Sequence, residues 1–185
     1  EKKPEKFELN TQLKSYNIDV KKAFQEWNNF YQEVILSENI SGRASLSLQL
    51  KADFNLDKGI NYPSIDSKIN LAINNGILKN SLVMKDLAGS IKDSPAKLAM
   101  GKKNLQLLET RLNEISFSTL KNEITIKNEE VIIPKMNISS SALNMNVSGT
   151  HAFSNDVDYR FDFKFRELLT NNRDSEFGEI IDDGT

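Results

Sequence analysis

The sequence predicts a mostly β protein of the α+β class: a curved antiparallel meander sheet of seven to nine strands, with one N-terminal amphipathic helix on or beside its apolar face. Long stretches alternate apolar and polar residues with a period of two, which is typical of strands with one buried face. Short polar turns separate these stretches and favour antiparallel neighbours. A single stretch, near residues 20–36, has the three- and four-residue spacing of an amphipathic helix.

The N-terminal part predicts a strand followed by this helix. The even spacing of apolar residues over 7–13 is a weak strand signal. Asp19 comes directly before the helical stretch and is expected to be its N-cap. The apolar stripe of the helix consists of Val20, Phe24, Trp27, Tyr31 and Val34.

The following segment predicts two strands and a hairpin. Apolar and polar residues alternate over 44–54 and again over 65–73. Asn75-Gly76 is a preferred dipeptide of type I′ turns, so a hairpin is expected there, leading into a new strand at 77–78.

The middle of the chain, residues 85–108, is less periodic. Gly89, Pro95 and Gly101 interrupt it, and such residues commonly mark turns and helix ends. We therefore expect a loop with short helical turns between the two halves of the sheet.

The second half is predicted to be a succession of strands. Alternation recurs over 115–126, 131–138 and 143–147. Pro134 indicates an edge strand or a bulge, and Gly149 indicates a bulge or a close approach of two backbones. After a tight turn expected at 154–156, one last strand carries the most aromatic stripe of the chain: Val157, Tyr159, Phe161, Phe163 and Phe165.

Composition excludes several classes of function. With 24 basic and 26 acidic residues the net charge is −2, which gives no general attraction to nucleic acid. The absence of cysteine excludes disulfides and Cys-based zinc or redox sites. No apolar run approaches the roughly 20 residues that span a bilayer as a helix.

Four segments of the chain carry a family resemblance. In order, they are SGRASLSLQLKADFN, PSIDSKINLAINNGILKN, LNEISFSTLKNEITIKNEEVIIPKMNISSSALNMNVSGTHAF and DVDYRFDFKFREL. Their order and spacing resemble the C-terminal region of the AsmA-like family of bacterial envelope proteins, with the best match over residues 40–169. The closing EFGEIIDDGT is similar to the versions found in Bacteroidetes-type bacteria.

This resemblance implies that residues 1–185 form a single periplasmic piece of a longer protein, anchored to the inner membrane by a helix outside this chain. Family members are linked to outer-membrane biogenesis and are grouped with bridge-like lipid transfer proteins related to TamB and chorein, whose sheets curl into a hydrophobic groove. The family carries no catalytic signature, so the resemblance implies no catalytic residue. The chain starts at Glu1 rather than Met, and Gly184 lies at its end, from which we expect further sequence on both sides.

A comparison of sizes supports a groove independently. Seven to nine strands make a sheet roughly 35–40 Å wide. A helix of 17 residues is about 25 Å long and about 10 Å across, and covers only two or three strands. The apolar face must therefore curl on itself, be covered by the middle segment, or remain open as a groove, and an open apolar strip usually marks a binding surface.

The residues expected to line such a groove share the apolar face of the strands. They are Leu46, Leu48, Leu50, Phe54, Ile69, Leu71, Ile73, Ile124, Ile126, Leu143, Met145, Val147, Tyr159, Phe161 and Phe163. The same alternation would also produce the closed core of an ordinary β-sandwich or of a sheet covered by a helix, and both interpretations stay open at this point. For Phe24 and Trp27 on the helix, a core position is the simpler interpretation.

Other candidate chemistry is weak. His151 is the only histidine and is expected to be an ordinary strand residue. Asp156 and Asp158 could share a strand face as paired acids of a glycosidase do, but a solvated turn is the simpler interpretation. The acidic pairs Glu129-Glu130 and Asp182-Asp183 are interpreted in the same way, and Ser139–Ser141 lacks the context of a nucleophile elbow.

The leading hypothesis is a non-enzymatic module of envelope biogenesis, without metal or cofactor, whose apolar sheet face shields phospholipid acyl chains between the inner and outer membranes. Its expected partners are a phospholipid or other envelope lipid and the remainder of the same chain, and no nucleic acid. One rival is a structural or protein-interaction scaffold that uses its sheet edges. The other rival is an enzyme that acts on envelope glycans.

Overall fold

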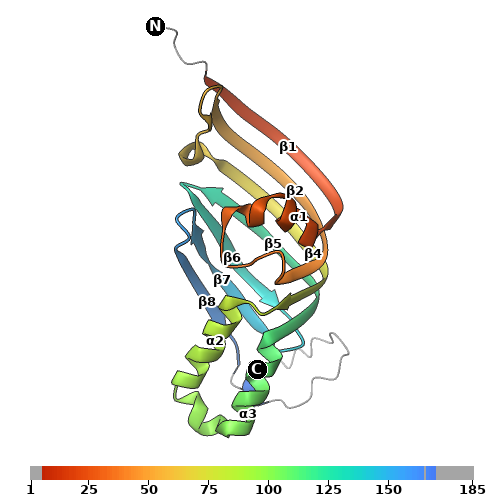
Figure 1. The fold of residues 1–185 in the computed structure, drawn as a ribbon, viewed down its shortest axis with the longest axis vertical. Helices are drawn as coiled ribbons and strands as arrows, with labels where there is room; N and C mark the ends of the chain where they lie inside the picture. Colours follow the sequence, from red (N-terminus) through yellow and green to blue (C-terminus); the bar gives the residue numbers. More distant parts are fainter. Residues whose placement is uncertain (1–5, 165, 170–185) are drawn as a thin grey trace, which may run out of the picture.

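The computed structural model describes residues 6–164 and 166–169, and within them eight antiparallel strands form one sheet. The strand order is β1-β2-β4-β5-β6-β7-β8, with the short β3 beside β2 (Figure 1). The strands are β1 (Lys6–Asp19), β2 (Ile40–Asn55), β3 (Gly59–Ile60), β4 (Asp66–Lys79), β5 (Glu114–Lys127), β6 (Glu130–Ile138), β7 (Met145–Ala152) and β8 (Val157–Asp162). The predicted meander of seven to nine strands is therefore confirmed. The aromatic stripe extends beyond β8 at Phe163, and Phe165 and the EFGEIIDDGT tail lie outside the described residues.

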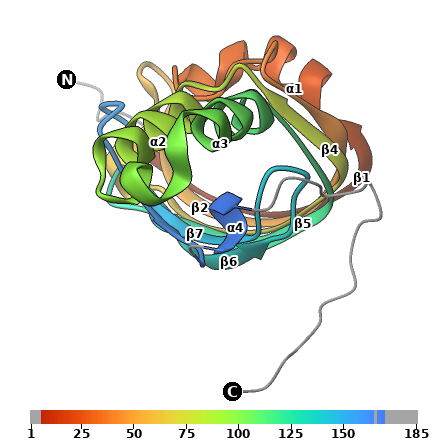
Figure 2. The same cartoon turned by 90° about the horizontal axis from the view of Figure 1, so that it is seen from below.

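The sheet has one apolar and one polar face because the strands alternate in register with one another. In the pairing of β2 with β4, Leu46 lies opposite Leu71, whereas Ser47 lies opposite Asn70. Figure 2 shows the sheet curling into a trough with the helices α1, α2 and α3 across its open side. The apolar face is thus the concave face, and the polar face is convex.

The N-terminal helix is shorter than predicted. Instead of running over residues 20–36, α1 (Val20–Glu26) ends after two turns and is followed by η1 (Asn28–Tyr31). All four residues of η1 have positive φ, from 48° to 57°, which makes a left-handed turn. The side chain of Gln32 stabilises the segment after this turn by accepting hydrogen bonds from the backbone N–H of Val34 and Ile35. The predicted N-cap is confirmed, since Asp19 accepts a hydrogen bond of 3.1 Å from Lys22 N–H.

The prediction of a loop with short helical turns over residues 85–108 is wrong, because this segment forms two helices, α2 (Leu82–Asp93) and α3 (Ala96–Asn113). Pro95 lies in the connection between them, where no helical hydrogen bond is lost. Gly101 adopts a φ of 70° at a kink inside α3. Gly89 faces open space within α2. The three residues that suggested a loop thus fall where helices tolerate them.

The prediction of a hairpin at Asn75-Gly76 is also wrong. β4 continues through both residues and pairs with β5 as far as Lys79 and Glu114. Asn75 has a φ of 49°, and the register between β2 and β4 shifts here, so the dipeptide forms a bulge instead of a turn.

Three local predictions in the second half are confirmed. The register between β6 and β7 shifts between Ile133 and Met136, which places a bulge at Pro134. A Cβ at Gly149 would lie 2.2 Å from the backbone oxygen of Asp158, so the two backbones approach closely there. The turn before β8 is closed by a hydrogen bond of 2.8 Å from Ala152 N–H to the oxygen of Asp156.

Two apolar clusters attach the helices to the concave face. The larger one joins α2 and α3 to the start of β5, the end of β6 and the start of β7, and buries Leu108 and Leu112 almost completely. The smaller one joins Val20 of α1 to Ala44, Ile73 and Phe117. In Figure 1, α1 crosses the sheet at mid-height while α2 and α3 lie at one end, so the helices cover only part of the trough.

Candidate functional site

The fifteen residues expected to line a groove fall into two groups. Seven belong to the packed clusters: Leu71, Ile73, Leu143, Met145, Val147, Phe161 and Phe163. The other eight lie outside both clusters and are half-buried: Leu46, Leu48, Leu50, Phe54, Ile69, Ile124, Ile126 and Tyr159. Leu143 also differs from expectation because it lies in the loop before β7 and is fully buried there. The concave face is therefore partly packed core and partly an apolar surface that lies outside both clusters of the described residues, the uncovered part.

The uncovered part contains a continuous apolar row across four strands. Leu13 of β1 pairs with Leu48 of β2, and Leu48 pairs with Ile69 of β4. Ile69 in turn pairs with Ile124 of β5. Because neighbouring strands lie about 4.8 Å apart, this row provides roughly 14 Å of apolar surface across the trough.

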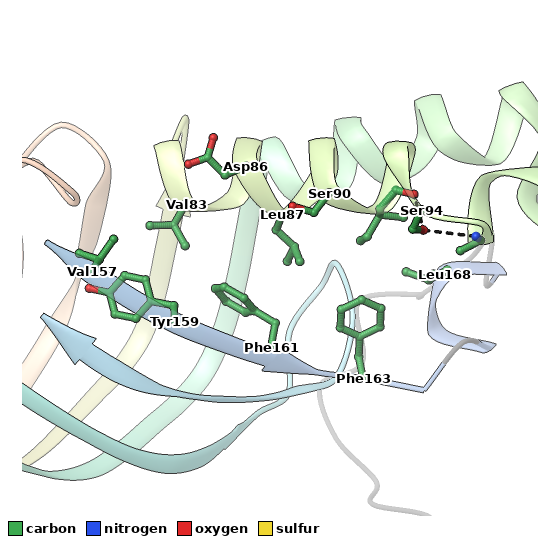
Figure 3. Close-up of a pocket in the computed structure, with 12 residues that line it drawn as sticks. Val83, Asp86, Leu87, Ser90, Ser94, Val157, Tyr159, Phe161, Phe163 and Leu168 are labelled. Carbon is green, nitrogen blue, oxygen red and sulfur yellow. Dashed lines mark hydrogen bonds between the residues drawn. The ribbon is translucent and has the colours of Figure 1, made fainter.

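A slot opens on one side of the trough, between α2 and the edge strand β8 (Figure 3). It has a volume of about 590 Å³. Figure 3 shows Val83 and Leu87 pointing down from α2, and Tyr159, Phe161 and Phe163 pointing up toward them. Leu168 of α4 (Arg166–Leu169) lines the far end. The slot thus lies between the apolar face of α2 and the aromatic stripe that β8 begins.

The rim of this slot is polar on the side of α2. Asp86, Ser90 and Ser94 line it beside the apolar residues. A groove with an apolar floor and a polar margin suits an amphiphile, because its chains leave water while its polar end stays hydrated.

The hydroxyl of Tyr159 has a polar partner despite its apolar surroundings. Its oxygen lies 3.1 Å from Nδ1 of His151 on the neighbouring strand. Burial raises the pKa of Tyr159 because desolvation disfavours the phenolate. This pair fixes the ring of Tyr159 between the slot and the concave face. His151 itself is a residue of β7, as the sequence predicted.

The helical half of the slot was missed by the sequence analysis. Val83, Leu87 and Ile91 recur every four residues and form one face of α2, but the glycine and proline residues nearby favoured a loop. The four-residue spacing was the signal that could have revealed this wall.

The described residues do not assemble a catalytic or metal site from the weaker candidates. Asp156 accepts a hydrogen bond of 2.7 Å from Ser154 within its turn. Asp158 is exposed on β8, on the face opposite Tyr159. Ser140 is buried and donates a hydrogen bond to the backbone oxygen of Leu143. Within residues 6–164 and 166–169, no group of three or more His, Asp or Glu side chains could hold a metal ion.

No helix within the described part of the chain has the length and apolar character needed to cross a membrane. Compared with protein-family models, with curated proteins and with solved structures, the chain gives no significant match.

Proposed function

We propose that this chain is a non-enzymatic lipid-binding module whose concave sheet face and lateral slot shield phospholipid acyl chains from water. The observation that carries this proposal is the half-buried row formed by Leu48, Ile69 and Ile124, which lies outside both packed clusters. Removing each acyl methylene from water contributes about 0.8 kcal/mol, so an apolar strip of this kind binds chains without directional contacts.

The resemblance to AsmA-like proteins extends this proposal to a cellular setting. In that setting the module belongs to a longer protein anchored in the inner membrane, resides in the periplasm, and serves the supply of lipid to the outer membrane. Its occupant is a phospholipid or another envelope lipid.

The test compares lipid carried by matched variants purified from bacterial cells. Leu48→Asn combined with Ile124→Asn places amides on the apolar row, whereas Gln49→Asn combined with Thr125→Asn places them on the convex face of the same strands. Native mass spectrometry and lipid extraction should find phospholipid with the wild type and with the convex-face control. We expect the concave-face variant to carry about tenfold less, since it loses the burial of roughly two methylenes. Equal lipid content in the two variants, or no lipid in the wild type after incubation with phospholipid vesicles, would reject the proposal.

A second candidate function is supported by the free edge of β1. This 14-residue strand pairs with β2 on one side only, and Phe7, Leu9 and Leu13 on it are exposed. Such an edge can pair with another strand, as a scaffold module of a larger protein would require. The substitution Gln12→Pro, in the middle of β1, should abolish pairing with a partner strand and leave lipid binding unchanged. Partner pairing that survives this substitution would contradict the scaffold function.

A further inference from the structure

A second pocket lies beside the slot, where four connecting segments meet. Its volume is about 460 Å³, and its walls come from η1, η2 (Tyr62–Ser64), the β5–β6 turn and the end of β7 with the following turn. Four aromatic side chains line it: Phe30, Tyr31, Tyr62 and Phe153. The pocket is thus rich in aromatic rings at a place where segments far apart in sequence converge.

Two rings of this pocket, those of Tyr62 and Phe153, are nearly perpendicular to each other. The centroids of Tyr62 and Phe153 are 6.1 Å apart with an interplanar angle of 86°. Phe30 makes two edge-to-face contacts, since its ring centroid lies 5.0 Å from that of Phe24 and 5.2 Å from that of Trp27. The left-handed turn of η1 therefore presents Phe30 and Tyr31 to the pocket from a supported position.

The charge of the pocket favours a cation. Glu129 is the only carboxylate among its lining residues, and no Lys or Arg lines it. None of the salt bridges among the described residues involves Glu129. The faces of aromatic rings carry negative potential and attract ammonium groups, a preference that an adjacent carboxylate strengthens.

The pocket is continuous with the concave face. Val131 and His151 line it and pair with each other across β6 and β7. Val131 also pairs with Ile126 of β5, one of the half-buried residues of the concave face. An amphiphile lying on the concave face would therefore reach the pocket with its polar end.

We propose that this aromatic pocket binds the ammonium group of a zwitterionic phospholipid headgroup, with Glu129 as counter-ion and Tyr31, Tyr62 and Phe153 as ring walls. This inference rests on the proposed lipid-binding function and adds a headgroup preference to it. Anionic headgroups without an amine, such as phosphoglycerol, gain nothing from these residues.

The test uses Trp27 as a reporter, because it is the only tryptophan and its ring lies 5.2 Å from Phe30. The full chain is titrated with short-chain phospholipids below their micelle concentration, with ethanolamine or glycerol headgroups on identical acyl chains. We expect the ethanolamine lipid to bind about fivefold more tightly, as one exposed cation–π site with a carboxylate would give. Glu129→Gln and Phe153→Leu should each reduce this preference by at least about twofold, whereas Glu123→Gln on the convex face of β5 should retain it.

Each outcome decides a separate point. Equal affinity of the wild type for both lipids, or an unchanged preference in Glu129→Gln, would overturn the headgroup inference and leave lipid binding intact. Failure of the wild type to bind either lipid would instead overturn the proposed function itself. If glycerophosphoethanolamine without acyl chains binds as tightly as the ethanolamine lipid, the ammonium site stands with a free amine as ligand, and its assignment to a lipid is overturned.

Discussion

The ring of Phe117 lies directly over the backbone of Gly76 on the neighbouring strand. The two residues are paired across β4 and β5, and a Cβ at Gly76 would lie 2.1 Å from Cζ of Phe117. Phe117 is buried in the cluster that attaches α1 to the sheet. Gly76 therefore makes room for the ring on which this attachment depends.

We expect Gly76→Ala to lower the free energy of unfolding by about 2 kcal/mol or more, because Phe117 would have to leave its position in a packed cluster. Gly89→Ala is the matched control, since a Cβ there meets nothing within 4 Å and alanine is the better helix former. This control should be stabilised by roughly 0.5–1 kcal/mol. Urea denaturation followed by circular dichroism measures both changes. Similar effects at the two glycines would contradict the close contact.

Truncation of leucines distinguishes the packed clusters from the uncovered row. Leu112 of α3 is 1% exposed, so Leu112→Ala should cost about 2–5 kcal/mol through cavity formation. Leu48 is half-buried on the concave face of the sheet, so Leu48→Ala should cost about 1 kcal/mol or less. A loss at Leu48 as large as that at Leu112, measured by urea denaturation, would indicate a closed core at the row.

The contribution of Asp19 to stability as the N-cap of α1 can be measured separately from that of its ion pair with Arg43. Asp19 accepts a hydrogen bond from Lys22 N–H and also lies 3.7 Å from Arg43 across the strand pair. Asp19→Ala should cost about 1 kcal/mol, whereas Asp19→Asn keeps the capping acceptor and should cost only a few tenths, since the ion pair is largely exposed. If both variants lost the same stability, the ion pair rather than the cap would be the source.

The partial burial of Tyr159 predicts a pH dependence of stability at alkaline pH. Burial raises its pKa above the ordinary value of 10.0, so the unfolded chain loses this proton at lower pH than the folded chain does. Its contribution to stability is therefore complete below about pH 10 and is lost as the pH rises through the folded pKa. Tyr159→Phe should show a smaller decrease in unfolding free energy than the wild type between about pH 8 and about pH 11.

Tyr16→Phe is the control for this titration, because Tyr16 is 72% exposed. Comparison of the two Tyr→Phe variants isolates the effect of the position of Tyr159. Coincident profiles for Tyr159→Phe and the wild type would show that the buried tyrosine does not contribute. Urea denaturation at each pH provides the comparison.

Filling the slot should reduce lipid binding without loss of folding. Ser90 is exposed on α2 and lines the slot, so Ser90→Trp adds bulk where an acyl chain would lie. Asp93→Trp at the exposed end of the same helix serves as the control, because Asp93 does not line the slot. We expect lipid occupancy to fall by about tenfold in the first variant only. Undiminished occupancy in Ser90→Trp would show that acyl chains do not use this slot.

The strands could be predicted from the sequence because their signal is local. Residues 44–54 alternate strictly, and the structure places them in β2 with Ala44 and Ala52 buried and Arg43, Gln49 and Lys51 exposed. The turn at 154–156 and the bulge at Pro134 also follow from properties of single residues. Such features depend on the backbone conformations that each type of residue prefers.

The remaining features depend on tertiary contacts. Asn75 adopts a positive φ inside β4, and Gly76 leaves room for the ring of Phe117, so the dipeptide lies in a bulge between paired strands and not in a turn. The apolar stripe of residues 20–36 favoured one helix, but the side-chain hydrogen bonds of Gln32 and Asn29 stabilise a left-handed turn instead. The slot requires both α2 and β8, which are far apart in the sequence.

The placement of α2 and α3 has a consequence for how material could travel through this protein. The two helices lie between β4 and β5 in the chain, and the almost fully buried Leu108 and Leu112 of α3 pack at that end of the trough together with Leu143 of the loop before β7. The trough is therefore filled by packed side chains at this end. On the proposed lipid-binding function, an acyl chain on the concave face would meet these packed side chains at this end, beside the slot between α2 and β8.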